Sequence, residues 1–183
     1  MIHRLLLLSS LLVACAPMPK PSDPRDISGI NPAFASYVQE FEVMYGHPIG
    51  DIPIQFAPLS GYTIGECVVW TGGWREIKID PDWWNYEAID DDQRESIIAH
   101  ELGHGVLNRG HITGNYLYTS LDGLSQWQMP ISLMYPDVFF SDWLEDWQTL
   151  KVYYYNELFH PSPGYPLLGE TSADEDFIHM DVK

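Results

Sequence analysis

The chain has 183 residues, 45% of them hydrophobic, and a formal net charge of -17 at pH 7. This length and apolar content predict one domain with a core of ordinary size rather than two domains. The strong negative charge argues against binding to nucleic acid and to anionic lipid surfaces, because both attract basic proteins.

Residues 1–14 predict an export signal. His3 and Arg4 precede an apolar run over residues 5–14 that is too short to span a bilayer as a mature helix. The sequence Leu12-Val13-Ala14-Cys15 resembles the lipoprotein box of bacteria, in which the cysteine becomes the first mature residue and carries the lipid. The alternative is an ordinary signal peptide followed by a cysteine without such a role.

Residues 15–30 are rich in proline and have almost nothing to bury, so we expect a lipidated, extended tether. If Cys15 carries a lipid, Cys67 is the one thiol left in the mature chain, and no disulfide can form within it. We expect Cys67 to be a small buried apolar residue rather than a reactive one.

The folded domain is expected over residues 31–160, beginning with a helix. Asn31 is a good N-cap, and Pro32 suits the first helical position. Apolar residues then recur at helical spacing as far as Tyr45, and Gly46 supplies the end of the helix. This helix is predicted to be part of the core scaffold.

A small sheet is expected next. Residues 52–56 alternate between apolar and polar, as in a half-buried strand. Residues 67–71 and 76–80 flank Gly72-Gly73, a pattern that is typical of a hairpin. Together with the helices, these strands predict an α+β fold with a small, mostly antiparallel twisted sheet.

His100-Glu101-Leu102-Gly103-His104 is the motif on which the functional prediction depends. Histidines four residues apart lie on one face of an α-helix and can hold one metal ion. Asp90, Asp91 and Asp92 are candidate N-caps for this helix, with Glu95 placed three residues after Asp92 as in a capping box. Buried without partners, two histidines and a glutamate would be costly, whereas a zinc ion with its water would satisfy all three.

The region around this motif resembles the metzincin clan of zinc peptidases, whose pattern is H-E-x-x-H-x-x-G-x-x-H. The resemblance implies a zinc ion held by His100, His104 and His111, and Glu101 as the general base that takes a proton from a zinc-bound water. The chain departs from the clan because six residues, not five, separate His104 from His111. Three residues before His111 stands Asn108, which can replace glycine in a left-handed helix exit. We therefore expect one extra helical residue before the turn; a chance exposed histidine at position 111 is the alternative.

Ser132-Leu133-Met134-Tyr135-Pro136 resembles the Met-turn of that clan, in its matrixin version. The resemblance implies that Met134 forms a hydrophobic floor beneath the three imidazoles, and that Tyr135 and Pro136 line the pocket for the side chain after the scissile bond. A turn with a core methionine and tyrosine is the plainer reading.

Downstream, apolar residues at positions 143, 147, 150, 154 and 158 predict a long amphipathic helix. Glu145 and Asp146 on this helix raise an alternative, because gluzincins take their third zinc ligand from a glutamate on a downstream helix. That assignment leaves His111 and the Met-turn without a role. Residues 161–183 are rich in proline and then acidic, and are expected to form a flexible tail.

The resulting hypothesis is a zinc metallopeptidase of metzincin-like fold, a monomeric endopeptidase anchored by its N-terminal lipid in the bacterial cell envelope. A substrate peptide is expected to lie extended along the outer edge of the sheet, on the strand at residues 67–71. Two other functions stay open: a zinc amidase acting on peptidoglycan, and a non-catalytic binding lipoprotein with a structural zinc. A structural site would usually be closed by four protein ligands, which argues against the last.

Overall fold

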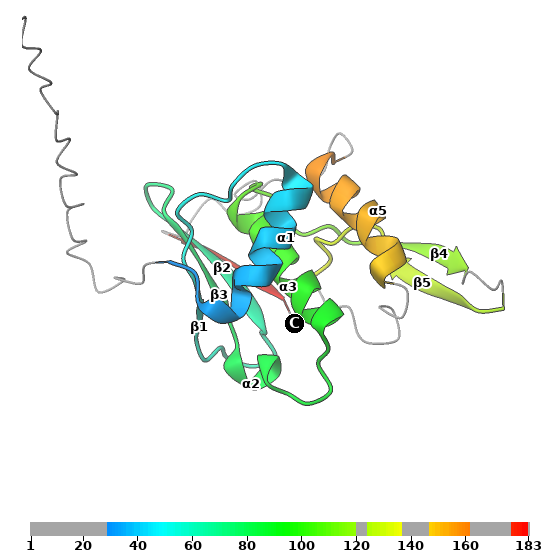
Figure 1. Ribbon diagram of the computed structural model, residues 1–183, viewed down its shortest axis with the longest axis horizontal. Coiled ribbons are helices and arrows are strands. Elements are labelled where there is room, and N and C mark those ends of the chain that lie inside the picture. The colour runs from blue at the N-terminus through cyan, green and yellow to red at the C-terminus, as the bar shows by residue number, and fades with distance from the viewer. Residues whose placement is uncertain (1–28, 120–123, 137–146, 162–176, 183) are drawn as a thin grey trace, which may run out of the picture.

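A four-stranded mixed sheet, a helix packed on it and two further helices form the α+β fold of the computed structural model, which describes residues 29–119, 124–136, 147–161 and 177–182 (Figure 1). Helix α3 packs on strands β2 and β3, and α1 and α5 pack against α3. The elements are η1 (Pro32–Phe34), α1 (Ala35–Tyr45), β1 (Ile54–Phe56), β2 (Gly65–Trp70), β3 (Arg75–Ile79), α2 (Pro81–Trp84), α3 (Asp91–Gly105), β4 (Asn115–Thr119), β5 (Gln126–Pro130), α5 (Trp147–Phe159) and β6 (Phe177–Val182).

The first helical segment begins and ends as the sequence predicts. The Asn31 side chain accepts a hydrogen bond from the N–H of Ala33 at 3.0 Å, and Pro32 opens the short helix η1 that leads into α1. Gly46 ends α1 with a φ of 79°, a left-handed conformation that favours glycine. Phe34 and Phe41 are fully buried, so this helix is part of the core.

The strand order of the sheet is β1-β3-β2-β6. β1 and β3 are parallel, whereas β2 is antiparallel to both of its neighbours, so the sheet is mixed but mostly antiparallel. Gly72 and Gly73, with φ of 94° and 83°, turn the chain between β2 and β3 as predicted. Strand β6 lies within the stretch that was expected to be a flexible tail. Several of its residue types favour strands, and the edge of β2 that does not pair with β3 is available for backbone hydrogen bonds.

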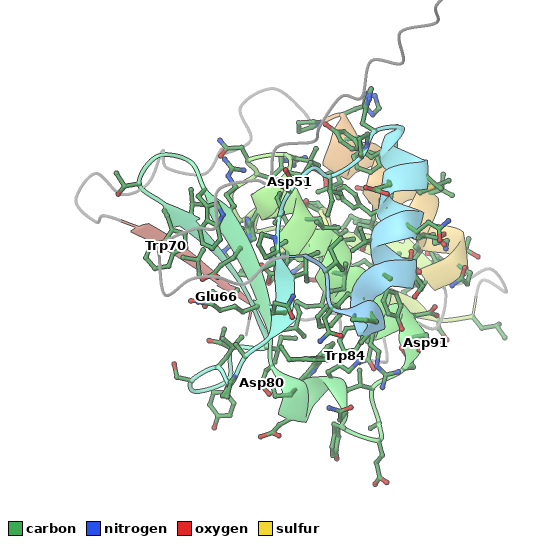
Figure 2. The ribbon with its side chains drawn as sticks, turned by 60° about the vertical axis from the view of Figure 1, so that its left-hand side comes forward. Asp51, Glu66, Trp70, Asp80, Trp84 and Asp91 are labelled. Atoms are coloured by element: carbon green, nitrogen blue, oxygen red, sulfur yellow. The ribbon has the colours of Figure 1, made fainter. Side chains whose placement is uncertain are left out.

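Asp80 and Trp84 connect the sheet to the helices. One carboxylate oxygen of Asp80 caps the short helix α2, and the other accepts from the N–H of Leu59 at 2.9 Å. Trp84, the last residue of α2, lies near the N-terminal end of α1 (Figure 2). Its ring meets the ring of Phe34 edge-on, with centroids 4.8 Å apart, and is 7% exposed. This aromatic contact fixes the loop that leads into α3.

The capping box of helix α3 lies two residues earlier than the predicted one. Asp90, not Asp92, is the N-cap: its carboxylate accepts from the N–H of Gln93 at 2.8 Å, and the Gln93 side chain accepts from the N–H of Asp90 at 3.0 Å. Glu95 is therefore free to serve elsewhere, and it is buried against α5. The two helical glycines meet close neighbours: Met134 lies against Gly103, and Ile77 against Gly105.

Strands β4 and β5 form a separate hairpin in the stretch between His111 and the predicted Met-turn, a stretch whose form the sequence does not predict. Helix α5 buries Trp147, Leu150, Tyr154 and Leu158, the apolar positions expected from the spacing. The export signal, most of the tether with Cys15, and residues 143–146 with Glu145 and Asp146 lie outside the described residues. Within the described part of the chain, no helix combines the length and apolar character needed to cross a membrane.

Candidate metal centre

Three histidines converge at the C-terminal half of α3. The Nε2 atoms of His100 and His104 lie 3.0 Å apart, and the Nε2 atom of His111 lies 3.3 Å and 3.2 Å from them. His100 and His104 are 2% and 0% exposed, whereas His111 is half-buried. Among the described residues, these three histidines are the group whose possible metal-ligating atoms all lie within 4.8 Å of one another.

The extra residue before His111 is accommodated at the end of α3. Asn108 adopts a φ of 57°, the left-handed exit that the sequence predicts, and is the described non-glycine residue with a positive φ. The N–H of Arg109 then donates to the carbonyl of Gly103 at 3.0 Å, six residues back. An ordinary Schellman closure spans five residues, so this wider closure absorbs the additional one.

Arg75 holds this exit in place from strand β3. Its guanidinium donates to the carbonyls of His104 and Gly105 at 3.1 and 2.6 Å, and to the side chain of Asn108 at 2.8 Å. These contacts satisfy carbonyls that the end of a helix leaves open and place a positive charge there, where the helix dipole is negative. The spacing of the motif does not reveal this role of Arg75.

Backbone carbonyls set the tautomers of two histidines. Nδ1 of His100 donates to the carbonyl of Leu133 at 2.7 Å, and Nδ1 of His104 donates to the carbonyl of Arg109 at 2.6 Å. Burial, together with the neighbouring histidines, lowers the pKa of His100 well below its usual value, and burial with His111 lowers the pKa of His104 to about 3. Both rings are therefore neutral at pH 7, and both carry their proton on Nδ1.

It follows that the Nε2 atoms of His100 and His104 face each other with lone pairs and no proton between them. Only the ring of His111 can place a proton at Nε2, so the 3.0 Å separation between the other two Nε2 atoms is not a hydrogen bond. A cation at the centre of the three atoms would turn this repulsion into attraction.

The donor set fits a metal ion. Nitrogen ligands at about 2.0–2.1 Å from a tetrahedral zinc ion are separated by about 3.3 Å, and the observed separations are 3.0–3.3 Å. Neutral imidazoles whose other nitrogen donates to a carbonyl are the usual form of histidine ligands. Imidazole serves zinc, copper, iron and nickel, so the geometry supports a transition metal without selecting one.

The turn at residues 132–134 lies against the histidines. Met134 is fully buried, and its sulfur packs on Gly103, next to His104. Its carbonyl accepts from the N–H of Ile112 at 2.8 Å, which ties the turn to the residue after His111. The turn therefore contacts the neighbours of all three histidines, since Leu133 already holds His100. Tyr135 and Pro136 follow, both half-buried; their role in a substrate pocket stays a prediction.

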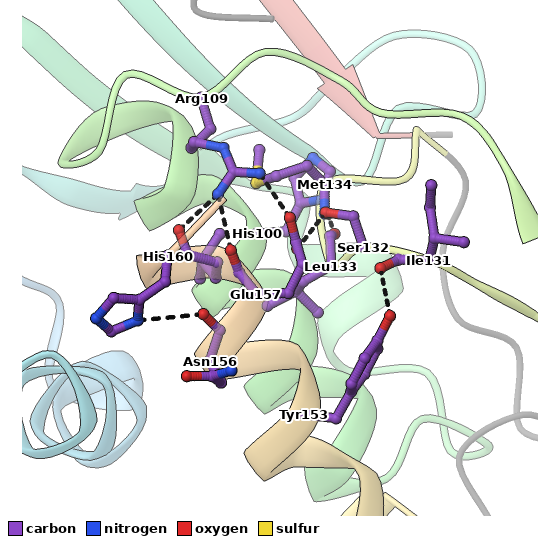
Figure 3. Close-up of polar contacts among 11 residues, drawn as sticks. His100, Arg109, Ile131, Ser132, Leu133, Met134, Tyr153, Asn156, Glu157 and His160 are labelled. Atoms are coloured by element: carbon purple, nitrogen blue, oxygen red, sulfur yellow. Dashed lines mark hydrogen bonds and ion pairs between the residues drawn. The ribbon is translucent and has the colours of Figure 1, made fainter. Parts of the chain in front are cut away.

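A single carboxylate on α5 links the backbone supports of both buried histidines (Figure 3). Glu157 accepts from the Arg109 guanidinium at 2.7 Å with one oxygen and from the Ser132 hydroxyl at 2.6 Å with the other. The Ser132 hydroxyl oxygen in turn accepts from the N–H of Met134 at 3.0 Å. Arg109 is 2% exposed and also donates to the carbonyl of Leu158 at 2.6 Å. We call Arg109, Ser132 and Glu157 the carboxylate brace.

Glu101 projects from the flank of α3 that faces the sheet. It is 0% exposed, and a Cβ placed on Gly65 of β2 would lie 2.5 Å from its Oε1 atom. Glycine at position 65 therefore makes room for the carboxylate. Cys67 is also fully buried on this strand, as predicted, and burial with the charge of Glu101 raises the pKa of its thiol.

The comparisons with known proteins identify no relative. Neither models of protein families, nor curated proteins, nor solved structures match this chain. The structure itself brings together His100, His104 and His111, with Met134 packed on Gly103 beside them, and places the buried Glu101 against Gly65 of β2. His160 is exposed, and its Nδ1 atom lies 3.3 Å from the carbonyl of Asn156, away from this group.

Proposed function

We propose that this chain is a zinc-dependent endopeptidase with a metzincin-like site. The proposal depends on one observation. The unprotonated Nε2 atoms of His100 and His104 lie 3.0 Å apart, next to a third imidazole nitrogen. Three imidazole ligands leave a fourth coordination position open, as catalytic zinc sites do and structural sites do not. A zinc ion held there would act as a Lewis acid that acidifies water and polarises a carbonyl.

The chain's own residues supply the remaining roles. Glu101 accepts a proton from the water that adds to the scissile carbonyl carbon, and it returns that proton to the amine when the C–N bond breaks. Its burial between α3 and β2 keeps the carboxylate out of bulk water, where it would be less basic toward a bound water. Met134 and the carboxylate brace hold the imidazoles in place.

A peptide substrate fits the surroundings of Glu101. Strand β2 passes directly beside its carboxylate, and the outer edge of β2 pairs with an extended segment, β6, along its whole length. Peptides bind to sheet edges through backbone hydrogen bonds. We place this activity in the bacterial cell envelope, with Cys15 as the lipid anchor, on the strength of the N-terminal sequence pattern.

The first test is metal content. The protein without residues 1–14 is expected to bind about one zinc ion per chain, with affinity reduced at least tenfold by His111→Ala, because one ligand of three is lost. His160→Ala is the matched control, since that histidine is exposed and points elsewhere. Zinc binding that is indifferent to His111 would overturn the proposed ligand set.

The second test is hydrolysis. Casein and mixed peptides are expected to be cleaved by the zinc-loaded protein, and a chelator is expected to abolish cleavage. Purified cell wall is assayed in parallel, because release of peptidoglycan peptides without casein cleavage would replace endopeptidase with amidase. A zinc-loaded protein that cleaves neither substrate would reject both hydrolases.

A further inference from the structure

Strand β6 covers the edge of the sheet beside the candidate metal centre. All six residues of β2, from Gly65 to Trp70, pair with β6 in antiparallel register, Gly65 opposite Val182 and Trp70 opposite Phe177. The other edge of β2 belongs to β3, so β6 is the outermost strand on this side (Figure 1). Without β6, the backbone N–H and C=O groups on the outer edge of β2 would be open to another strand.

The covered edge leads to Glu101. The Val182 end of β6 lies opposite Gly65, and Gly65 is the residue whose missing side chain makes room for the Glu101 carboxylate, 2.5 Å from the position of a Cβ. The Cα atoms of directly opposed residues in an antiparallel pair of strands are about 4.5–5.5 Å apart. Any extended segment on this edge in the register of β6 therefore passes close to the carboxylate.

The way in which β6 is held makes it exchangeable. In the described chain β2 is the one strand with which β6 shares a hydrogen-bonded ladder, so the segment is held at the sheet along one edge. Backbone pairing does not depend on a particular sequence, so another extended peptide can take the same place.

We propose that Phe177–Val182 is an intramolecular competitor for the peptide-binding edge of β2, so that the chain restrains its own access to peptide substrates. The binding edge itself is independent of catalysis, whereas the inhibitory consequence rests on the proposed endopeptidase function. The apparent affinity for an external peptide is then reduced by the fraction of time for which β6 occupies the edge.

A proline scan of the full-length chain tests the competition. Single prolines are placed at Ile178, His179, Met180 and Asp181, in a Glu101→Gln background that removes hydrolysis from the measurement. Successive N–H groups of a strand point alternately toward and away from its neighbour, so alternate prolines break the ladder with β2 and the others are tolerated. Each position thus serves as the control for the next.

The probe is a fluorescent peptide with the sequence of residues 177–182, and the readout is its anisotropy. Two alternate variants are expected to bind it about tenfold more tightly than the unsubstituted chain, if β6 covers the edge about nine-tenths of the time, and the other two are expected to bind like that chain. Equal binding by all four variants, or binding by none, would overturn the proposal. Circular dichroism and zinc content, unchanged across the four, establish that each variant is folded.

The same prolines in a chain with Glu101 intact separate the two proposals. The releasing variants are expected to hydrolyse a peptide with KM lowered about tenfold and kcat unchanged. If peptide binding alternates between tight and weak along the four variants but none of them hydrolyses the peptide, the endopeptidase function is rejected and the competition by β6 is retained. If every variant hydrolyses the peptide with the same KM, the endopeptidase function is retained and the competition by β6 is rejected.

Discussion

Helix α3 carries two buried polar clusters, and they differ in how their polar atoms are satisfied. In the N-terminal half, Glu95 is 7% exposed and meets three donors from α5. In the C-terminal half, the Nε2 atoms of His100, His104 and His111 meet one another.

The Glu95 cluster is complete within the chain. One carboxylate oxygen accepts from the indole of Trp147 at 3.0 Å, and the other accepts from the hydroxyl of Tyr155 at 3.2 Å and lies 3.6 Å from the ammonium of Lys151. Donors and a positive charge balance the buried carboxylate, as a group that only joins two helices requires.

The histidine cluster, in contrast, brings ring nitrogens together. Its Nδ1 atoms are satisfied by carbonyls, yet two Nε2 lone pairs converge at 3.0 Å. Burying two such lone pairs close together costs free energy. A turn, a helix exit and the carboxylate brace nevertheless hold the two imidazole rings in this position. The difference separates a cluster whose partners all come from the chain from one whose three imidazole nitrogens could hold a metal ion.

The largest expected effect comes from Glu101, which follows His100 on α3. Glu101→Gln keeps the size of the side chain but cannot accept a proton, so hydrolysis is expected to fall by about 10²–10⁴-fold while zinc stays bound. Glu95→Gln, on the same helix, is the control and is expected to leave turnover of the folded protein unchanged. Steady-state kinetics at equal zinc content measure both, and full activity in Glu101→Gln would remove Glu101 from the mechanism.

The metal-free protein is expected to lose stability on mild acidification. The pKa of both His100 and His104 is lowered in the folded chain, that of His104 to about 3, whereas unfolded histidine titrates near 6.5. Between these values the unfolded state binds more protons, so the stabilisation is present above about pH 6.5 and declines as the pH falls.

From pH 6.5 to pH 5 each of the two histidines is expected to cost about 2 kcal/mol of unfolding free energy. Urea unfolding in chelator measures the change, and His100→Gln with His104→Gln is the comparison, because glutamine does not titrate. An equal loss in that double variant would assign the pH dependence to other groups.

The carboxylate brace is expected to affect metal affinity next. Glu157→Gln removes the charge that holds Arg109 at 2.7 Å and Ser132 at 2.6 Å, so the carbonyls that orient His104 and His100 become less constrained. Loss of such support typically lowers metal affinity about 10–100-fold. Competition with a zinc chelator measures the affinity.

The visible spectrum of the cobalt-substituted protein is the readout that a purely structural role would not move. A changed spectrum in Glu157→Gln is expected, with Glu40→Gln as the control because Glu40 pairs with Lys151 away from the site. Unchanged spectrum and affinity would restrict Glu157 to holding α5 in place.

Local chemistry explains which parts could be predicted from the sequence. Asn31, Gly46 and Asn108 each act within a few residues of their own position, so the helix ends that they set could be predicted. The histidine cluster follows from the period of α3 together with the exit at Asn108. The competing caps at positions 90–92 differ too little in local chemistry, and the selection of Asp90 was missed.

Long-range partners explain the rest. Glu157 meets Arg109 across 48 positions and Ser132 across 25, and neither spacing has a period that a sequence pattern reveals. The pairing of β6 with β2 was missed because a six-residue strand in an acidic, proline-rich stretch is a weak signal. Both contacts arise when distant elements pack, which single-residue preferences do not encode.

The smallest expected effect belongs to the complete cluster and is a change in stability alone. Glu95→Gln keeps one acceptor for Trp147 or Tyr155 but leaves Lys151 without its charge partner on α3, which is expected to lower the unfolding free energy by about 1–2 kcal/mol. Zinc affinity is expected to stay the same, because none of the three donors touches a histidine or its carbonyl support. Urea unfolding of the zinc-loaded protein and chelator competition measure the two quantities. A loss of zinc affinity in Glu95→Gln would mean that the two halves of α3 are coupled, and that the helix transmits strain from its interface with α5 to the histidines.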